Sequence, residues 1–358
     1  MATIQLNPDI SKLVDGLTSD GETWSNSSLV SVTQITPSGL DLLYKKALEM
    51  RTLVKTQGGD DRLKHRILAS VFYEASTRTS CSFQTAMLRL GGTFIHVDAG
   101  SGGNTSASKK GESLSDTIKC LQCYTDVTVL RHSIKGNVGD IVVNGGLEKP
   151  VINAGDGVGE HPTQALLDLF TIVDELNMLN SSSDQEEPLV VVLLGDLKHG
   201  RTVHSLAKLL ARSQKGFLKR KLILRYCSPP SLTMPQYVKD YVDEYAGNGN
   251  IVQEVFADEG ADATDKVLNN ANVLYVTRVQ KERFVSEEEY EKVKGAYIVD
   301  NNFMKDAPSK MIVMHPLPRV DEISTEVDSD PRAAYFRQME NGLFVRMAIL
   351  DLVVRKLN

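Results

Sequence analysis

Short apolar runs alternate along the chain with stretches in which apolar side chains recur at helical spacing. The runs expected to form strands are residues 67–73, 93–97, 126–130, 150–153, 189–194, 221–226, 251–255, 273–276 and 311–314. The expected helices lie near 36–53, 83–90, 114–121, 162–173, 201–212, 234–245, 286–294 and 343–357. Strands that alternate with helices are typical of βαβ units, so this pattern predicts α/β architecture with mostly parallel sheets flanked by helices.

The length of the chain changes the picture from one sheet to two. A chain of 358 residues is long for a single hydrophobic core, so two domains are expected. The segment 180–188 is polar and aperiodic and is expected to be a surface loop rather than the boundary between them. We predict two α/β domains with the ligand site in the cleft between them.

Composition and charge exclude several functional classes. The net charge of −6 argues against a nucleic-acid-binding protein, which needs a basic surface. No apolar run is long enough for a membrane span, and residues 1–30 resemble neither a signal peptide nor a transit peptide. Four cysteines in so long a chain indicate a reducing compartment. A cytoplasmic protein is expected.

The first cluster of candidate ligand-binding residues is Ser76-Thr77-Arg78-Thr79, where a predicted strand passes into a helix. Backbone N–H groups at a helix start point outward with the positive end of the helix dipole behind them. Three hydroxyls and a guanidinium in the same turn favour a tetrahedral oxyanion such as phosphate. The alternative, that Ser76 only caps the helix, accounts for one hydroxyl but not for the remaining three residues.

Further polar residues follow other predicted strands. Arg131 ends one strand, at the carboxyl edge where α/β sheets bind ligands. His161 and Gln164 share one face at the start of a helix, where they offer donors and an amide acceptor. Arg201 and Arg278 follow two later strands and suit a substrate with two carboxylates.

Other motifs are read as structural. The loop 101–112 lacks the spacing of a nucleotide-binding P-loop, and Gly155–Gly159 lacks the third glycine of the dinucleotide fingerprint. Cys120 and Cys123 lack a second pair that would complete a zinc site, so both are expected to pack within their helix. No acidic or histidine cluster proposes another metal, and neither a metal nor a cofactor is expected.

In the order of these motifs the chain resembles the aspartate carbamoyltransferases, from about residue 36 to the C-terminus. The motifs are Ser76-Thr77-Arg78-Thr79, Ser106 with Lys109-Lys110-Gly111-Glu112, Arg131-His132, Asn153-Ala154-Gly155-Asp156-Gly157, His161-Pro162-Thr163-Gln164, Gly195-Asp196-Leu197-Lys198, Gly200-Arg201-Thr202-Val203-His204-Ser205, Thr277-Arg278-Val279-Gln280-Lys281-Glu282-Arg283 and His315-Pro316-Leu317-Pro318-Arg319-Val320-Asp321-Glu322. Ser80 departs from the pattern, because relatives often carry arginine there.

The resemblance implies transfer of the carbamoyl group of carbamoyl phosphate to the α-amine of L-aspartate, in pyrimidine biosynthesis. It implies that the phosphate is held by Ser76, Thr77, Arg78, Thr79 and Arg131. The carbonyl oxygen would be polarised by Thr79, Arg131 and His161, and the amino group held by Gln164 and the carbonyls of Pro316 and Leu317. Arg201 would bind the α-carboxylate of aspartate, and Arg278 with Gln280 the β-carboxylate.

The resemblance also implies a homotrimer, in which Ser106 and Lys110 reach a neighbouring subunit's site and Lys110 contacts both substrates. It implies a carbamoyl phosphate domain over 36–161 with 335–358, an aspartate domain over 162–334, and an unassigned polar extension over 1–35.

Three alternatives compete with this interpretation. An ornithine carbamoyltransferase would place a cysteine near the His315 segment, which has none, so aspartate is favoured. A catalytically inactive paralogue would have lost one of Arg78, Arg131, His161, Arg201 or Arg278, and all five are present. A module excised from a larger pyrimidine-pathway polypeptide stays open.

Overall fold

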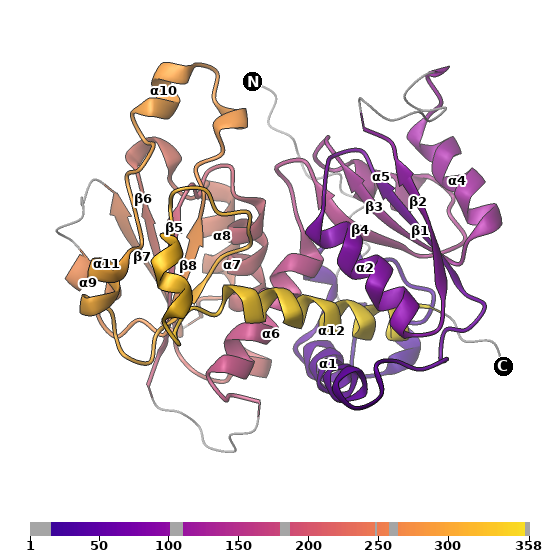
Figure 1. The fold of residues 1–358 in the computed structure, drawn as a ribbon, viewed down its shortest axis with the longest axis horizontal. Helices are drawn as coiled ribbons and strands as arrows, with labels where there is room; N and C mark the ends of the chain where they lie inside the picture. Colours follow the sequence, from indigo (N-terminus) through magenta and orange to yellow (C-terminus); the bar gives the residue numbers. More distant parts are fainter. Residues whose placement is uncertain (1–15, 101–109, 180–186, 248, 258–263, 355–358) are drawn as a thin grey trace. The chain divides into compact units, whose positions relative to one another are not determined.

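The chain folds into two compact units, each built around its own parallel sheet (Figure 1). The computed structural model describes residues 16–100, 110–179, 187–247, 249–257 and 264–354. The first unit runs to Leu167 and resumes at Glu340, and the second runs from Asp168 to Met339. Both boundaries fall inside helices, α6 (Pro162–Glu175) and α12 (Tyr335–Val353). The predicted fold class, two α/β domains with parallel sheets, is confirmed.

The first unit contains a four-stranded sheet in the order β2-β1-β3-β4, with all neighbouring strands parallel. The strands are β1 (Ile67–Phe72), β2 (Thr93–Asp98), β3 (Val127–His132) and β4 (Val151–Asp156). Besides α6 and α12, the described residues of this unit form the helices α1 (Pro37–Gln57), α2 (Arg78–Arg89), α4 (Leu114–Tyr124) and α5 (Asn137–Asn144). Ala69 and Val71 of β1 form a buried cluster with Ile118 of α4 and Val138 of α5, so α4 and α5 cover one face of this sheet (Figure 1).

Local sequence explains the bounds of α1. The Thr36 side chain accepts a hydrogen bond from the backbone N–H of Gly39, and Pro37 occupies the first helical position, where a missing N–H costs nothing. Gly58 ends the helix in the left-handed conformation with φ of 83°, which glycine adopts without strain. The helix is therefore delimited by its own residues and then buried by packing.

The second unit contains a five-stranded parallel sheet in the order β7-β6-β5-β8-β9. The strands are β5 (Leu189–Gly195), β6 (Leu222–Ser228), β7 (Ile251–Ala257), β8 (Val273–Thr277) and β9 (Ile312–Met314). The helices are α7 (Arg201–Ser213), α8 (Gln236–Glu244), α9 (Thr264–Leu268), α10 (Glu287–Glu291) and α11 (Asn301–Asp306). Every residue of β5 is buried, as expected for a central strand with both faces covered.

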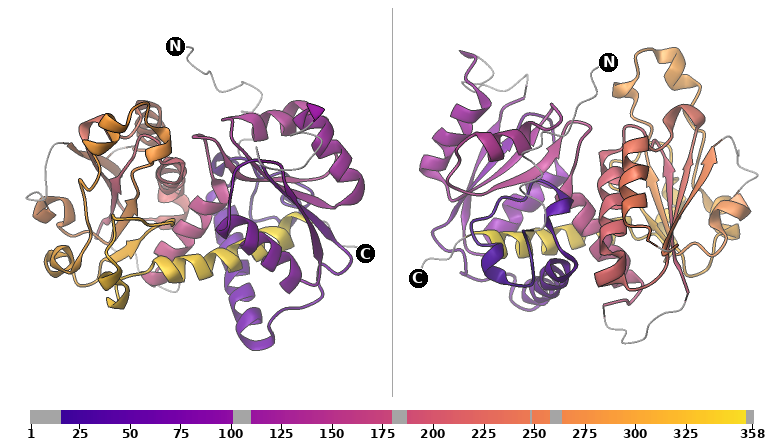
Figure 2. Two further views of the ribbon diagram at one scale, coloured as in Figure 1. Left: turned by 45° about the horizontal axis from the view of Figure 1, so that its top comes forward. Right: turned by 180° about the vertical axis from the view of Figure 1, so that it is seen from behind.

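Helices lie on both faces of this second sheet. Val190, Val192 and Leu194 of β5 form a buried cluster that includes Val267 of α9 and Met304 of α11. The intervening side chains of β5 point to the opposite face, and Figure 2 shows α7 and α8 side by side there. The sheet is thus enclosed between two helical layers, which explains its continuous apolar strands.

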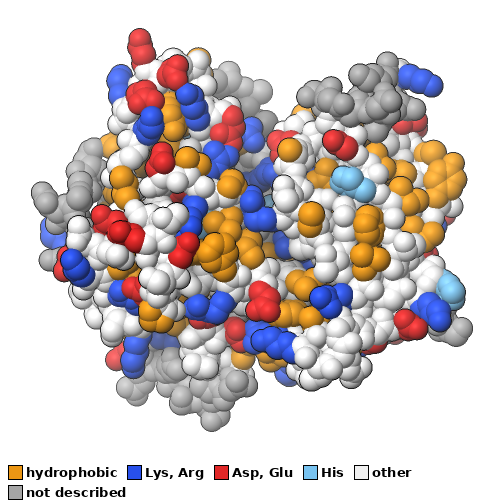
Figure 3. All heavy atoms as spheres, in the orientation of Figure 1, with side chains coloured by type: hydrophobic (Ala, Val, Ile, Leu, Met, Phe, Trp, Pro, Cys, Tyr) orange, Lys and Arg blue, Asp and Glu red, His pale blue; other side chains and the backbone are white. Residues whose placement is uncertain are grey.

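The surface of the second unit around α10 carries mixed charge. On the face drawn in Figure 3, acidic and basic side chains are interspersed over this helix, and Lys281 Nζ lies 2.5 Å from Glu287 Oε1. Among the residues that the structure describes, no helix is long and apolar enough to span a membrane.

The predicted strands all form, with ends that differ by a few residues. The final helix starts at Tyr335, earlier than the apolar periodicity from residue 343 indicates, because its first turn mixes buried Tyr335 and Gln338 with exposed side chains. Helices α5, α9 and α11 were not predicted. Residues 16–35, which belong to the polar segment at the start of the chain, contribute the fully buried side chains of Trp24 and Leu29 to the first unit.

The prediction that Cys120 and Cys123 pack inside their helix is wrong. Both thiols are free and exposed. Helix α4 buries Thr117, Ile118 and Gln122. Because 3.6 residues make one turn, positions 120 and 123 lie on the side of the helix away from Ile118 and Gln122.

Candidate active site

In the first unit, the candidate residues lie at the point where strand order reverses. The chain passes from β1 outward to β2 and then crosses to β3 on the other side of β1. Parallel α/β sheets bind ligands outside the carboxyl ends of the strands at such a reversal. The segment 76–79 follows β1, and Arg131 is the last residue but one of β3, paired with Phe72 of β1.

The turn between β1 and α2 carries the predicted oxyanion residues. Helix α2 begins at Arg78, and Thr77 at its N-cap position makes no side-chain capping bond. Ser76 is therefore not the cap, and the structure does not support the capping explanation for these hydroxyls. Thr77 and Arg78 are exposed, whereas Thr79 is buried in the first turn. The first-turn N–H groups and the dipole of α2 favour an anion at this place.

Thr79 and His161 are brought together from distant parts of the sequence. The Thr79 hydroxyl lies 3.3 Å from Nε2 of His161, and both side chains are buried. His161 directly precedes α6, and its carbonyl accepts a hydrogen bond from the N–H of Gln164, at 3.0 Å. The buried Gln164 lies in the first turn of the same helix. The structure therefore places a hydroxyl, an imidazole and an amide near the ends of β1 and β4.

Arg131 is held from two directions. Its carbonyl accepts a hydrogen bond from the N–H of Tyr73, at 2.9 Å, and its Nε lies 3.3 Å from Oε2 of Glu74. Glu74 had no predicted role, although its place between β1 and the hydroxyl run is a usable signal. The carboxylate can orient the guanidinium, whose planar fork suits an anion with several acceptor oxygens.

His132, the neighbour of Arg131, has a structural environment. Its ring lies 4.8 Å from the ring of Tyr73, and Nδ1 accepts a hydrogen bond from the N–H of Ile134. Burial lowers the pKa of His132 and outweighs the smaller, opposite effect of the Glu74 charge, so the neutral ring is favoured. It supports the turn after β3 rather than offering a charged group.

In the second unit, the candidate residues follow three adjacent strands. Strand order reverses between β5 and β8, and β9 lies next to β8. Arg201 is the first residue of α7 after β5, Arg278 follows β8, and Pro316 and Leu317 follow β9. The paired register of Gly195 with Thr277 shows that the first two strands end at the same level. Both arginines are partly exposed.

Arg278 is oriented by Glu282 four residues later. Both terminal nitrogens of its guanidinium bond the Glu282 carboxylate. These bonds raise the pKa of Arg278, although partial burial opposes the increase. Partial burial favours the protonated form of Glu282, but the same bonds outweigh that effect and lower the pKa of Glu282. Both groups are charged at neutral pH, so the arginine remains a cationic donor.

A buried carboxylate, Asp196, organises the polar turns beside these arginines. It is fully buried and accepts hydrogen bonds from the N–H of His199 at 3.0 Å and of Gln280 at 3.3 Å. Its other contact is with Nδ1 of His199, at 3.1 Å. Asp196 therefore links the turn that leads to Arg201 with the segment that follows Arg278. Asp196 belongs to a motif noted in the sequence but had no predicted role.

The segment after β9 has a defined backbone. Nδ1 of His315 accepts from the N–H of Leu317 at 2.7 Å, so Nε2 carries the proton and donates to Oε1 of Glu322, also at 2.7 Å. Leu317 has φ of 54°, and the Leu317–Pro318 bond is cis. The side chains of His315 and Glu322, at the two ends of this segment, therefore hold its carbonyl groups in place.

Two predicted residues are not placed in either group. Ser106 lies outside the described residues. Lys110 is described and exposed at the start of the segment that leads into α4. Within the described ranges, His, Cys, Asp and Glu side chains form no group of three or more that could hold a metal ion.

Comparisons with known proteins match this geometry over nearly the whole chain. The aspartate/ornithine carbamoyltransferase carbamoyl-P binding domain matches residues 27–174, and the Asp/Orn binding domain of the same family matches residues 187–353. The chain is 48% identical to the multifunctional protein pyr1-3 of Dictyostelium discoideum over 354 residues, which are 99% of this chain and 15% of that protein. The chain thus spans only a small part of such multifunctional relatives.

Shorter relatives match along their whole length. The aspartate carbamoyltransferase catalytic subunit of Vibrio cholerae serotype O1 is 41% identical, with 92% of this chain and 96% of that protein covered. The crystal structure of Trypanosoma cruzi aspartate transcarbamoylase in complex with N-(phosphonacetyl)-L-aspartic acid has a TM-score of 0.82 and 39% identity, covering 93% of this chain and 97% of that one. These matches agree with the two parallel sheets and with the motifs at their carboxyl ends, and the chain belongs to the aspartate/ornithine carbamoyltransferase family.

Proposed function

We propose that this chain transfers the carbamoyl group of carbamoyl phosphate to the α-amine of L-aspartate, giving N-carbamoyl-L-aspartate and phosphate, in pyrimidine biosynthesis. The observation that carries the proposal is the buried contact of Thr79 with His161 beside an anion-binding helix start. A phosphate held at that helix start has its neighbouring carbonyl oxygen within reach of hydroxyl and imidazole donors. Similarity to aspartate carbamoyltransferases in both sequence and structure supports the choice of reaction.

Most of the carbamoyl phosphate contacts are assigned to the first unit. The phosphate is bound by Ser76, Thr77, Arg78, Thr79 and Arg131. Thr79, Arg131 and His161 polarise the carbonyl oxygen. Gln164 accepts from the amino group, as do the carbonyls of Pro316 and Leu317 from the second unit. These assignments use cationic and hydroxyl donors for the anion and neutral acceptors for the N–H donors, as the chemistry requires.

Aspartate is assigned to the second unit and to Lys110. Arg201 binds the α-carboxylate, while Arg278 and Gln280 bind the β-carboxylate. The hydrogen bonds of Glu282 to Arg278 and of Asp196 to the Gln280 backbone support this assignment, because both hold a donor in a fixed direction. Planar guanidinium groups match carboxylates bidentately, which favours a dicarboxylate over an amine-bearing side chain.

The mechanism needs no covalent enzyme intermediate. The neutral amine of aspartate attacks the carbonyl carbon, negative charge develops on the carbonyl oxygen, and phosphate leaves with the electron pair of the C–O bond. The departing phosphate accepts the proton of the amine. A preorganised donor aimed at the developing oxyanion contributes roughly 3 kcal/mol to the rate, and holding the two substrates in reactive orientation adds up to about 7–11 kcal/mol in ideal cases.

The proposal includes a homotrimer in a cytoplasmic compartment. Ser106 and Lys110 act on the site of a neighbouring subunit, and the exposed side chain of Lys110 supports this role. The four cysteines are free, as expected under reducing conditions. The boundaries proposed for the two substrate domains are 36–161 with 335–358 for carbamoyl phosphate and 162–334 for aspartate, with residues 1–35 unassigned.

Initial rates with carbamoyl phosphate and either aspartate or ornithine test the proposal. We expect activity with aspartate only, and Arg278→Ala should raise the KM for aspartate at least tenfold. Arg337→Ala is the control, because Arg337 forms a partly exposed pair with Glu175 and should leave both constants unchanged. Activity with ornithine only would overturn the aspartate assignment. Binding of carbamoyl phosphate without either reaction would favour a non-catalytic role.

A further inference from the structure

The carboxyl group of Asp168 is fully buried in the second unit and bonds two side chains from distant elements. Asp168 lies in α6, Tyr275 in β8 and Gln338 in α12. The Tyr275 hydroxyl donates to Oδ2 at 2.7 Å, and the Gln338 amide donates to Oδ1 at 2.6 Å. All three side chains are fully buried, so these hydrogen bonds are shielded from solvent. Burying a carboxyl group costs free energy unless hydrogen bonds compensate, so both bonds are needed to keep Asp168 in this position.

The first arm of this arrangement leads to the segment after β9. Gln338 donates to Asp168 and, through Oε1, accepts from the backbone N–H of His315 at 3.0 Å. A flipped amide would place its NH₂ group against the His315 N–H, so the orientation of Gln338 is determined by its two partners. His315 in turn bonds the N–H of Leu317 and the carboxylate of Glu322. The first arm therefore ends at the backbone that carries the carbonyls of Pro316 and Leu317.

The second arm leads to the start of α7. Burial and the neighbouring Asp168 carboxyl hold the pKa of Tyr275 well above its ordinary value, although a hydrogen bond with the Thr202 side chain opposes this effect. The hydroxyl consequently stays protonated at any assay pH and donates to Asp168. Thr202 directly follows Arg201, the first residue of α7. The second arm therefore ends in the first turn of α7, at the residue next to the arginine assigned to the α-carboxylate of aspartate.

We infer that Asp168 is a positioning residue that aligns two parts of the binding site without touching either substrate. Through Gln338 and His315 it sets the acceptors for the amino group of carbamoyl phosphate, and through Tyr275 and Thr202 it sets Arg201. This inference rests on the proposed function, because it uses the substrate roles assigned to Pro316, Leu317 and Arg201. It adds that the two substrates depend on separate arms of one buried hydrogen-bond system.

Separate arms predict separable defects. Removing a hydrogen bond of the second arm should raise the KM for aspartate, and removing one of the first arm should raise the dissociation constant of carbamoyl phosphate. A general loss of stability would instead lower activity toward both substrates. Each arm contains one side chain that can be changed without altering the backbone: Tyr275 in the second and Gln338 in the first. The chain also offers a matched control for each.

Tyr275→Phe removes only the hydroxyl that joins Asp168 to Thr202. We expect the KM for aspartate to rise about tenfold, the size of one lost hydrogen bond to a charged group, while the dissociation constant of carbamoyl phosphate changes less than twofold. Tyr226→Phe is the control: Tyr226 is equally buried in β6 and donates to Oε1 of Gln253, outside both arms. It should leave both constants unchanged.

Gln338→Leu removes the amide that joins Asp168 to His315. We expect the dissociation constant of carbamoyl phosphate, measured without aspartate, to rise about tenfold, while the KM for aspartate at saturating carbamoyl phosphate changes less than twofold. The control is Gln214→Leu, because Gln214 is also buried and its amide donates to the carbonyl of Arg220. Asp168→Ala should raise both constants.

The outcomes separate the inference from the function beneath it. Arg201→Ala must raise the KM for aspartate. If it does not, the substrate assignment fails whatever the arm variants do. If it does, but Tyr275→Phe and Gln338→Leu change both constants equally or change only the melting temperature, the positioning role of Asp168 is overturned. Should Asp168→Ala not fold, the two single-arm variants still decide the question.

Discussion

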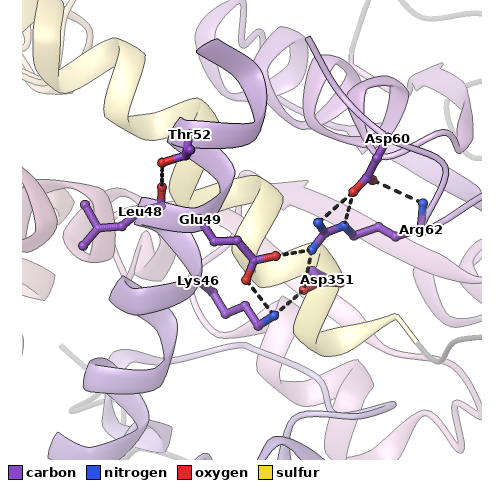
Figure 4. Close-up of polar contacts among 7 residues, drawn as sticks. All are labelled: Lys46, Leu48, Glu49, Thr52, Asp60, Arg62 and Asp351. Atoms are coloured by element: carbon purple, nitrogen blue, oxygen red, sulfur yellow. Dashed lines mark hydrogen bonds and ion pairs between the residues drawn. The ribbon is translucent and has the colours of Figure 1, made fainter. Parts of the chain in front are cut away.

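The carboxylate of Asp351 in α12 lies 3.3 Å from Nη1 of Arg62, although the two residues are 289 positions apart in the sequence (Figure 4). The Asp351 side chain is 1% exposed and also lies 3.4 Å from Nζ of Lys46 in α1. Arg62 additionally pairs with Asp60 at 2.7 Å and Glu49 at 2.8 Å. These charges join α1, the segment before β1 and α12 within the first unit.

Asp351→Asn should destabilise the first unit. The change removes the negative charge from a buried site and leaves two cations with less compensation, so we expect the free energy of unfolding to fall by roughly 3 kcal/mol. Urea-induced unfolding measures the difference. The control is Asp41→Asn, which breaks an exposed i,i+4 pair with Lys45 and should cost about 0.5 kcal/mol or less. Equal losses in both variants would contradict a special role for the buried carboxylate.

Thr79→Val should impair chemistry more than binding. Valine keeps the shape of the side chain but removes the hydroxyl that contacts His161. Loss of one preorganised donor at a developing oxyanion lowers kcat by about 100-fold, whereas phosphate retains its other donors and should bind nearly as well. Steady-state kinetics measure kcat, and a phosphate titration measures the dissociation constant of phosphate. Thr85→Val, later in the same helix, serves as the control, and an equal effect there would indicate a general disturbance of α2.

Asp196→Asn should weaken aspartate binding. The substitution removes a negative charge that orders the His199 turn and the backbone of Gln280. We expect the KM for aspartate to rise about tenfold, with little change in carbamoyl phosphate binding, because the affected groups lie beside Arg201 and Arg278. Asp240→Asn, an exposed change in α8, is the matched control. A defect confined to carbamoyl phosphate would contradict this prediction.

Glu322 should make stability depend on pH on the acid side. Partial burial opposes ionisation, yet the hydrogen bond from His315 lowers the pKa of Glu322 below its ordinary value of 4.5. The folded state then binds fewer protons than the unfolded state as this group titrates, so the contribution is complete above about pH 4.5 and is lost as pH falls through the lower folded-state pKa.

Glu322→Gln tests this dependence. The difference in free energy of unfolding between wild type and variant should be largest near pH 6 and should shrink on acidification below about pH 4.5. Urea unfolding at several pH values provides the measurement. Glu288→Gln, an exposed change in α10, controls for the loss of one negative charge. A difference that grows toward acid would contradict this prediction.

The sequence by itself determined the strands, most of the helices and the positions of the candidate residues at their ends. Apolar runs followed by helical periodicity predicted the strands, because burial on both faces requires continuous apolar side chains in a parallel sheet. The residues 76–79 predicted an anion site, because a helix start displays its N–H groups whatever surrounds it. Arg201 and Arg278 could likewise be placed at strand ends from their positions alone.

Only the tertiary structure decided which of these residues meet and what supports them. Asp168 bonds Tyr275 across 107 positions and Gln338 across 170, and no local periodicity indicates such pairs. The exposure of Cys120 and Cys123 also depended on which face of α4 meets the sheet. Neighbouring residues determine local secondary-structure propensity. Long-range hydrogen bonds depend instead on how whole elements pack, which is a property of the complete fold.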